Sequence, residues 1–174
     1  AGYRRFTFHG LNAGAWRINN AGDWVGWVED PIDGARPAHV VDGVNLHGGG
    51  DWWPQLWFSD INDSGEALGG YVSPETGLSH TILAHGSWRF DTGLLSGMPF
   101  FDPDTGSWSW SAAMNGHGEF AGGAVGLRAG DWTYAGYRFD GGFREIRFAG
   151  RGTSYVSPES INTAGTVVGH AAAG

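Results

Sequence analysis

Eight tryptophans and aspartates in this sequence are candidates for binding a sugar. They are Trp52, Trp53, Trp108, Trp110, Trp132, Asp51, Asp102 and Asp104. All but Trp132 lie in two stretches, residues 47–57 and 100–110, which interrupt an otherwise regular chain. An indole offers a flat apolar face on which a sugar ring stacks, and a carboxylate accepts hydrogen bonds from sugar hydroxyls. The sequence therefore predicts carbohydrate recognition by exposed aromatic residues, with burial of Trp52 and Trp53 over strand ends as the alternative.

The acidic residues also suit a second chemistry, the cleavage of sugar chains. Glycoside hydrolysis uses two carboxyl groups about 5 to 10 Å apart. The acids available for such a pair are Asp51, Asp102, Asp104 and Glu119. Eight of the eighteen acidic residues lie directly beside a glycine, as in turns, and the chain has neither a Gly-x-Ser-x-Gly elbow nor a phosphate-binding loop. We therefore assign no catalytic residue and expect a lectin-like binding module. A glycoside hydrolase or polysaccharide lyase, and a structural repeat protein without a ligand, are the alternatives.

Metal sites are not expected, although two segments resemble calcium loops. Residues 102–106 read Asp-x-Asp-x-Gly but lack the acidic ligand that closes such a loop, and residues 60–65 belong to a repeated turn. Calcium at these segments is the alternative to no cofactor at all. The seven histidines show no close spacing typical of zinc ligands. His39 and His80 are interpreted as equivalent repeat positions, which favours structural hydrogen bonds.

Composition excludes several classes of partner. Ten Lys and Arg stand against eighteen Asp and Glu, a net charge of −8, so the chain lacks the basic surface that nucleic acids and anionic membranes require. No apolar run approaches the ~20 residues needed to cross a bilayer. Cysteine is absent, so disulfides are not expected. The chain begins at Ala1 without a signal-peptide pattern, which fits a mature exported product or an excised fragment. We expect an extracellular or periplasmic protein.

The elements that must position these residues come from an internal repeat. Four segments share the pattern Ile/Met-Asn-x-x-Gly-x-x-x-Gly without gaps: residues 18–26, 61–69, 114–122 and 161–169. Such a pattern between apolar runs predicts a hairpin, in which Asn caps the turn and the first Gly takes a positive φ. The second Gly is expected to relieve crowding or to mark a bulge in the outgoing strand.

A second hairpin is predicted in the first three copies, with Asp42-Gly43, His85-Gly86 and Asp140-Gly141-Gly142 as turns. Each unit then offers about four short antiparallel strands, as in a propeller blade. Residues 3–10 match residues 143–150 in pattern, so the N-terminal strand is expected to complete the fourth unit. We predict one domain over residues 1–174, an all-β four-bladed propeller closed by that strand. A β-sandwich and an open repeat completed by oligomerisation are the alternatives.

The repeat resembles that of the bacterial extracellular HAF-repeat proteins. Their units read roughly Gly-Ile-Asn-x-x-Gly-x-x-Val-Gly, followed by a His-Ala/Gly-Phe-Leu strand. All four copies match the first half, whereas the second half keeps the histidine at His39 and His80 and loses it in residues 133–136. The resemblance implies export and a propeller-like fold. It implies no particular reaction, and the repeat residues themselves are architectural.

Overall fold

The fold is all-β. The structure is a computed structural model that describes residues 7–32, 34–46, 55–86, 88–92, 108–128, 131–146 and 153–173. Within these ranges the chain forms fifteen β-strands and no helix, so the expected class is confirmed. Among the described elements there is accordingly no helix long and apolar enough to cross a membrane. All strand pairs are antiparallel and join strands that are consecutive in the sequence.

Each copy of the repeat forms a sheet of its own. The first sheet contains β1 (Thr7–Phe8), β2 (Leu11–Ile18), β3 (Trp24–Asp30), β4 (Gly34–Val41) and β5 (Val44–Asn45). The second contains β6 (Trp57–Ile61), β7 (Ala67–Val72), β8 (Ser79–His85) and β9 (Trp88–Asp91). The third contains β10 (Trp108–Met114), β11 (Phe120–Arg128), β12 (Asp131–Phe139) and β13 (Phe143–Ile146). The fourth contains β14 (Thr153–Ile161) and β15 (Val167–Ala173). The predicted four strands per unit are thus confirmed for the second and third copies.

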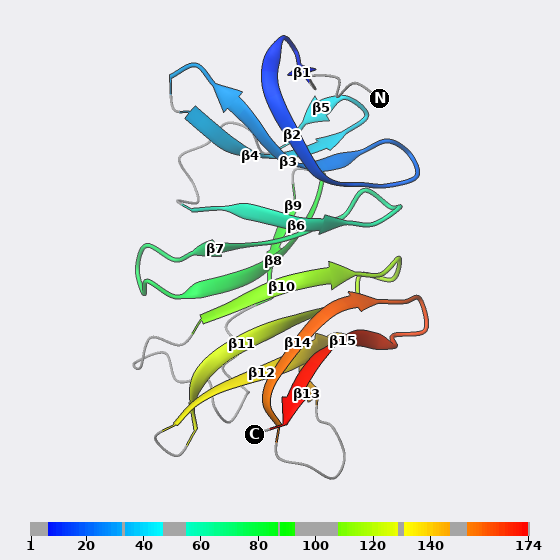
Figure 1. Cartoon of the computed structure of the whole chain (residues 1–174). Coiled ribbons are helices and arrows are strands. Elements are labelled where there is room, and N and C mark those ends of the chain that lie inside the picture. Colours follow the sequence, from blue (N-terminus) through cyan, green and yellow to red (C-terminus); the bar gives the residue numbers. More distant parts are fainter. Residues whose placement is uncertain are drawn as a thin grey trace, which may run out of the picture.

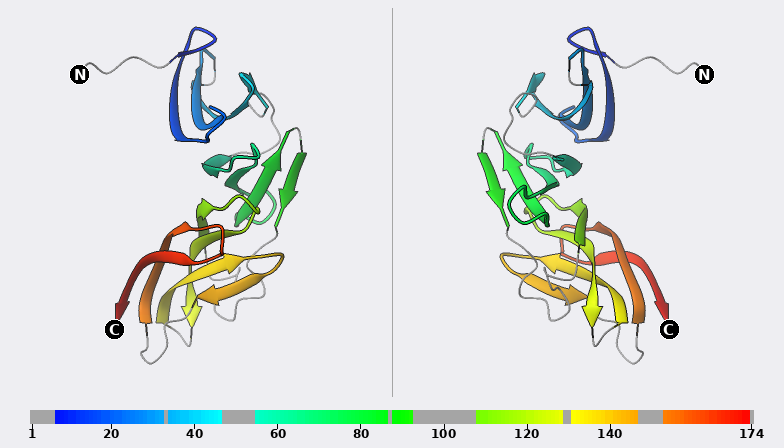
Figure 2. Two further views of the ribbon diagram at one scale, coloured as in Figure 1. Left: turned by 90° about the vertical axis from the view of Figure 1, so that its right-hand side faces the viewer. Right: turned by 90° about the vertical axis from the view of Figure 1, so that its left-hand side faces the viewer.

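The four sheets stack in chain order as an open array (Figure 1). β1 lies at one end of the array and β15 at the other, as Figure 2 also shows from two sides. The fourth sheet packs through β14 against β10, β11 and β12 of the third sheet. The prediction of a propeller ring closed by the N-terminal strand is therefore wrong.

A tight turn explains why the N-terminal strand does not reach the fourth sheet. His9 and Gly10 both have positive φ, 48° and 81°, and Phe8 pairs with Leu11 across them. A two-residue turn with two positive φ angles is the type I′ turn of β-hairpins. The chain therefore folds back at once and pairs with β2. Residues 3–6 of the predicted closing strand lie outside the described ranges.

The first sheet instead closes on itself as a half-barrel. The Nε2 atom of His9, at one edge, lies 3.4 Å from the main-chain oxygen of Gly43, at the other edge. Inside the curve, Phe8 packs edge-on against Trp24 with ring centroids 5.6 Å apart. Trp24 belongs to an apolar cluster with Val28 and with two residues of β4. Curling thus buries an apolar face that a flat five-stranded sheet would expose.

The Asn-x-x-Gly segments form the predicted turns in all four repeats. In the second repeat, Asn62 Oδ1 accepts hydrogen bonds from the main-chain N–H groups of Ser64 and Glu66, both at 3.0 Å. Gly65 has the expected positive φ of 75°. The other three repeats have the same pair of turn hydrogen bonds and the same positive-φ glycine. The Asn side chain therefore replaces main-chain partners that the turn leaves unsatisfied.

The second glycine of each motif lies against the incoming strand. A Cβ atom added at Gly69 would stand 2.2 Å from the main-chain oxygen of Trp57. A Cβ atom added at the equivalent glycine of each other repeat would stand 1.9–2.1 Å from the corresponding main-chain oxygen. The register of β6 shifts between Phe58 and Asp60, opposite this glycine. The same shift occurs in β2, β10 and β14. Crowding is thus confirmed as the reason for the glycine, but the predicted bulge lies on the incoming strand.

Two of the three predicted second turns are confirmed. Asp42-Gly43 connects β4 to β5, and residues 140–142 connect β12 to β13. The third is shifted by one position, since His85 still pairs with Trp88 and is therefore the last residue of β8. Its turn begins at Gly86, which has a φ of 57°.

Three of the four core clusters in the described residues span neighbouring repeats, and the fourth lies inside the first sheet. Val25 of the first repeat shares a cluster with Ile61 of the second, and Leu68 of the second shares one with Met114 of the third. At the third junction, Ala121 shares a cluster with Ile161. These three clusters thus join each sheet to the next one, as in repeat proteins generally.

Candidate functional site

The structure brings together three tryptophans that the sequence interpretation did not select. Trp16, Trp27 and Trp57 line a groove between the first and second sheets, with a volume of about 300 Å³. The other lining residues are small, apolar or cationic: Gly26, Ala35, Arg36, Pro37, Leu56 and Phe58. Concave sites with aromatic walls and a few polar groups are the usual form of small-molecule and sugar sites. This groove is therefore the candidate functional site.

Trp16 reaches the groove because it is the extra residue of a bulge. The register of β2 shifts between Ala15 and Arg17, so Trp16 has no partner on β3. A bulge re-aims side chains, and the Trp16 side chain is 62% exposed at the groove. The bulge positions of the next two repeats hold Ser59 and Ala112. An exposed indole at this position is therefore particular to the first repeat.

Trp27 and Trp57 lie flat on the two sheets because a glycine stands opposite each of them. Trp27 pairs with Gly14, where an added Cβ would meet the indole at 2.3 Å. Trp57 pairs with Gly70, where the corresponding distance is 2.4 Å. Both indoles are half-buried, so one face of each packs on the sheet. The glycines thus hold the two rings in place as walls of the groove.

These tryptophan–glycine pairs occupy the same two positions of the repeat but in opposite order. In the second repeat the tryptophan is on the incoming strand and the glycine is on the outgoing strand. In the first repeat the glycine, Gly14, is on the incoming strand and the tryptophan, Trp27, is on the outgoing strand. The third repeat follows the second, with Trp110 opposite Gly123. The exchange places Trp27 on β3. It was visible in the aligned repeats and is the signal that would have pointed to the groove.

Arg36 supplies a charged group at the groove. Its Nε atom lies 3.7 Å from a carboxylate oxygen of Asp30, and both side chains are about one third exposed. No described residue lining the groove is acidic. The described lining therefore offers stacking surfaces and hydrogen-bond donors but no carboxyl pair for glycoside hydrolysis.

The ligand-binding residues predicted from the sequence are described only in part. Asp51, Trp52, Trp53, Asp102 and Asp104 lie outside the described residues. Trp108 is the first residue of β10 and Trp132 lies on β12, but the described part of the structure excludes both side chains. Trp110 is half-buried on β10, and its indole lies 2.1 Å from where a Cβ of Gly123 would be. Trp110 therefore packs on its own sheet as Trp57 does.

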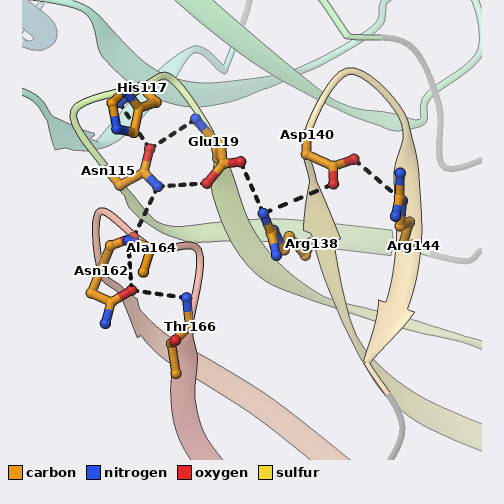
Figure 3. A network of polar contacts seen from close by, with 9 residues as sticks. All are labelled: Asn115, His117, Glu119, Arg138, Asp140, Arg144, Asn162, Ala164 and Thr166. Atoms are coloured by element: carbon orange, nitrogen blue, oxygen red, sulfur yellow. Dashed lines mark hydrogen bonds and ion pairs between the residues drawn. The ribbon is translucent and has the colours of Figure 1, made fainter.

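Glu119, one of the acids considered for catalysis, is part of a structural network (Figure 3). Its carboxylate accepts hydrogen bonds from Asn115 Nδ2 at 2.7 Å and from Arg138 Nη2 at 2.8 Å. These two donors lower the pKa of Glu119 below its ordinary value because they stabilise the charged form. Arg138 also lies 3.9 Å from Asp140, which in turn approaches Arg144. Glu119 is thus held as an ionised acceptor, the opposite of a general acid.

His39 and His80 have structural hydrogen bonds, but they are not equivalent positions. His39 pairs with Val25, and its counterpart in the third repeat is Arg138, which pairs with Ala121. In the second repeat the equivalent position is Leu83, which pairs with Leu68, whereas His80 lies three residues earlier on β8 and pairs with Tyr71. The expected equivalence is therefore wrong, because it was inferred from residue type and not from strand register.

The two histidines have different surroundings. His39 is fully buried, its Nε2 lies 2.9 Å from the main-chain oxygen of Gly65, and burial lowers its pKa. His80 Nδ1 lies 2.9 Å from Asp91 Oδ2, which also accepts a hydrogen bond from Tyr71. Burial, followed by the contact with Asp91, raises the pKa of Tyr71 to about 12. Within the described ranges, no three His, Asp or Glu side chains gather as metal ligands.

Comparison with known proteins does not assign this arrangement to a family. No protein-family model matches the chain, and no curated protein sequence matches it significantly. Conclusions about function therefore rest on the geometry of the groove and of the repeats.

Proposed function

We propose that this chain is an extracellular or periplasmic binding module that recognises carbohydrate through the groove between its first and second sheets. The observation that carries the proposal is the arrangement of Trp16, Trp27 and Trp57 around a volume of about 300 Å³, with Trp16 62% exposed. The Trp16 indole contacts Gly26 at its Cδ1 edge, where an added Cβ would stand 2.6 Å away, and 62% of the residue's surface remains exposed. Stacking of a sugar ring on that face is the interaction that aromatic residues in such grooves support.

The remaining features of the groove favour binding over cleavage. The guanidinium of Arg36 is a hydrogen-bond donor for sugar hydroxyls, while the described lining contains no carboxylate. Trp52 and Trp53 precede Trp57 by only a few residues in the sequence, so residues 47–57 stay within the proposal as a second contact region. The resemblance of the repeat to HAF-repeat proteins supports an exported protein and belongs to the same proposal.

A glycan array followed by titration of tryptophan fluorescence tests this function. We expect one class of oligosaccharide to bind with micromolar to millimolar affinity and to change the fluorescence of the wild-type protein. Trp16→Ala is expected to weaken binding about 5- to 150-fold, by analogy with the loss of about 1–3 kcal/mol when an aromatic side chain that stacks on a base is replaced by alanine. Trp88→Ala removes an indole that is 71% exposed on β9 and outside the groove, so it serves as the matched control.

Two results would contradict the proposal. One is the absence of binding across neutral, acidic and amino sugars at millimolar concentration. The other is equal loss of binding in the Trp16 and Trp88 variants, which would show that the groove is not the site.

A further inference from the structure

We propose that the two ends of the array bind each other between copies of this chain, so that the protein associates head to tail. The contact would reproduce the junction that already joins consecutive repeats. It pairs the turn of the fourth repeat in one copy with the turn of the first repeat in the next. The proposal concerns the ends of the array and does not depend on sugar binding in the groove.

The first line of support is a ladder of asparagines that connects the repeats. Asn19 Nδ2 donates to the main-chain oxygen of Asn62 at 3.0 Å, and Asn62 Nδ2 donates to that of Asn115 at 3.4 Å. Asn115 Nδ2 donates in the same way to Asn162 at 2.9 Å. Each junction therefore has a donor in the earlier repeat and an acceptor in the later one.

The ladder is incomplete at both ends. Asn162 Nδ2 donates to none of the described residues, and in Figure 3 it points away from the network formed by the other labelled side chains. In the three earlier repeats the Asn side chain also contacts a carboxylate that lies four residues later in the sequence. In the fourth repeat that position holds Thr166. At the other end, the main-chain oxygen of Asn19 accepts only from its own turn, at Gly22, among the described residues. The donor at one end and the acceptor at the other are the two halves of one further rung.

The second line of support comes from apolar residues at equivalent positions. Val25, Leu68 and Ala121 have no exposed surface because the following repeat covers them. Their counterpart in the fourth repeat, Val168, is 60% exposed. The apolar position that is buried at each of the three junctions is therefore uncovered on the fourth repeat.

The first repeat shows the complementary exposure. Ile61, Met114 and Ile161 are all at least 93% buried, because each packs against the preceding repeat. Ile18, at the same position of the first repeat, is 67% exposed. Ile18 and Val168 are therefore the two partners of an unformed junction of the type that joins Val25 to Ile61.

A second copy is the occupant that these features fit. β2 and β15 lie at opposite ends of the array, so Ile18 and Val168 of one chain do not meet (Figures 1 and 2). A second copy brings both the apolar partner and the asparagine acceptor in the spacing that the internal junctions use. Because the two surfaces differ, the contact is heterologous and generates either a closed ring of subunits or an open chain of them.

Sedimentation velocity over a wide range of protein concentration tests the proposal. We expect the average mass of the wild type to rise from one chain to several as concentration increases. Ile18→Asp and Val168→Asp each remove one surface by placing a charge at an exposed position, and each variant alone is expected to stay at the mass of one chain. Ile32→Asp alters a 90% exposed apolar residue that follows β3, at the opposite end of this strand from the Trp24–Ile18 pair, and is expected to assemble as the wild type does.

Mixing the two end variants gives the sharpest outcome. The Ile18→Asp copy keeps an intact fourth repeat and the Val168→Asp copy keeps an intact first repeat, so an equimolar mixture is expected to form dimers and nothing larger. This result also shows that both variants are folded. A wild type that keeps the mass of one chain at every concentration, or end variants that assemble as the wild type does, would overturn the proposal. So would a mixture that remains entirely monomeric although the wild type assembles.

Discussion

Asn62 Nδ2 lies 2.7 Å from the carboxylate of Glu66 and 3.4 Å from the main-chain oxygen of Asn115, so one buried side chain connects its own turn to the next repeat. Its Oδ1 atom meanwhile caps the turn. The same residue type thus builds the hairpin and joins the sheets. Asn19 and Asn115 have the same double use, whereas Asn162 caps its turn alone within the described part of the chain.

Replacing Asn62 by alanine is expected to lower the free energy of unfolding by about 2–4 kcal/mol, because two turn N–H groups and the Asn115 oxygen lose partners in a buried setting. Asn162→Ala is the matched control. It removes the same two turn hydrogen bonds at an exposed turn without breaking a bond to a following repeat. Its expected loss is about 0.5–1.5 kcal/mol. Urea denaturation of dilute protein measures both, and equal losses would contradict a structural role for the ladder.

Gly69→Ala is expected to destabilise the protein by about 1–3 kcal/mol or more, because its Cβ would stand 2.2 Å from the main-chain oxygen of Trp57. Main-chain atoms cannot move aside as the end of a flexible side chain does. Gly142→Ala provides the comparison, since nothing lies within 4 Å of its added Cβ and its φ is not positive. Thermal unfolding should therefore show a large decrease for the first variant and almost none for the second. Similar melting temperatures would show that the bulge adapts.

Trp110→Ala is expected to separate packing from ligand binding. The indole lies over Gly123 and is half-buried, so its removal should cost at most about 3 kcal/mol of stability. Sugar affinity, measured below the unfolding transition, should stay within about twofold of wild type because Trp110 is not among the residues that line the groove. Trp27→Ala, which removes a wall of the groove, should weaken binding. The reverse result would move the site from the groove to residues 100–110.

Glu119 is expected to make stability depend on pH in the acid range. Its pKa in the folded protein is lowered by Asn115 and then Arg138, below the ordinary value of 4.5. The unfolded chain therefore binds this proton at a higher pH than the folded one does. The stabilising contribution is fully present above pH 4.5 and is lost as the pH falls through the lower pKa of the folded state.

Glu119→Gln is the test of that pH dependence. Unfolding free energy measured between neutral pH and pH 3 should fall less steeply in the variant than in the wild type, because one proton uptake has been removed. Identical slopes for Glu119→Gln and wild type would show that the two hydrogen bonds do not discriminate between the charged and neutral carboxyl group.

The sequence by itself determined the hairpins. Asn-x-x-Gly acts within five residues through its own side chain and a positive φ, so the turns at Asn19, Asn62, Asn115 and Asn162 follow from local chemistry alone. The all-β class and the division into four sheets followed from counting these turns. The repeats also predicted crowding at the second glycine, although not which strand carries the bulge.

Only the tertiary structure decided how the sheets are arranged and where a groove forms. The two-residue turn at His9 and Gly10 directs β1 to its own sheet, which leaves the array open. Trp16 becomes a groove residue because a bulge turns it toward Trp57, a residue 41 positions away in the sequence. Such relationships depend on how separate sheets pack, and packing is set by long-range contacts such as that between Val25 and Ile61. A repeat specifies its own hairpin locally, whereas its neighbours determine which of its side chains remain exposed.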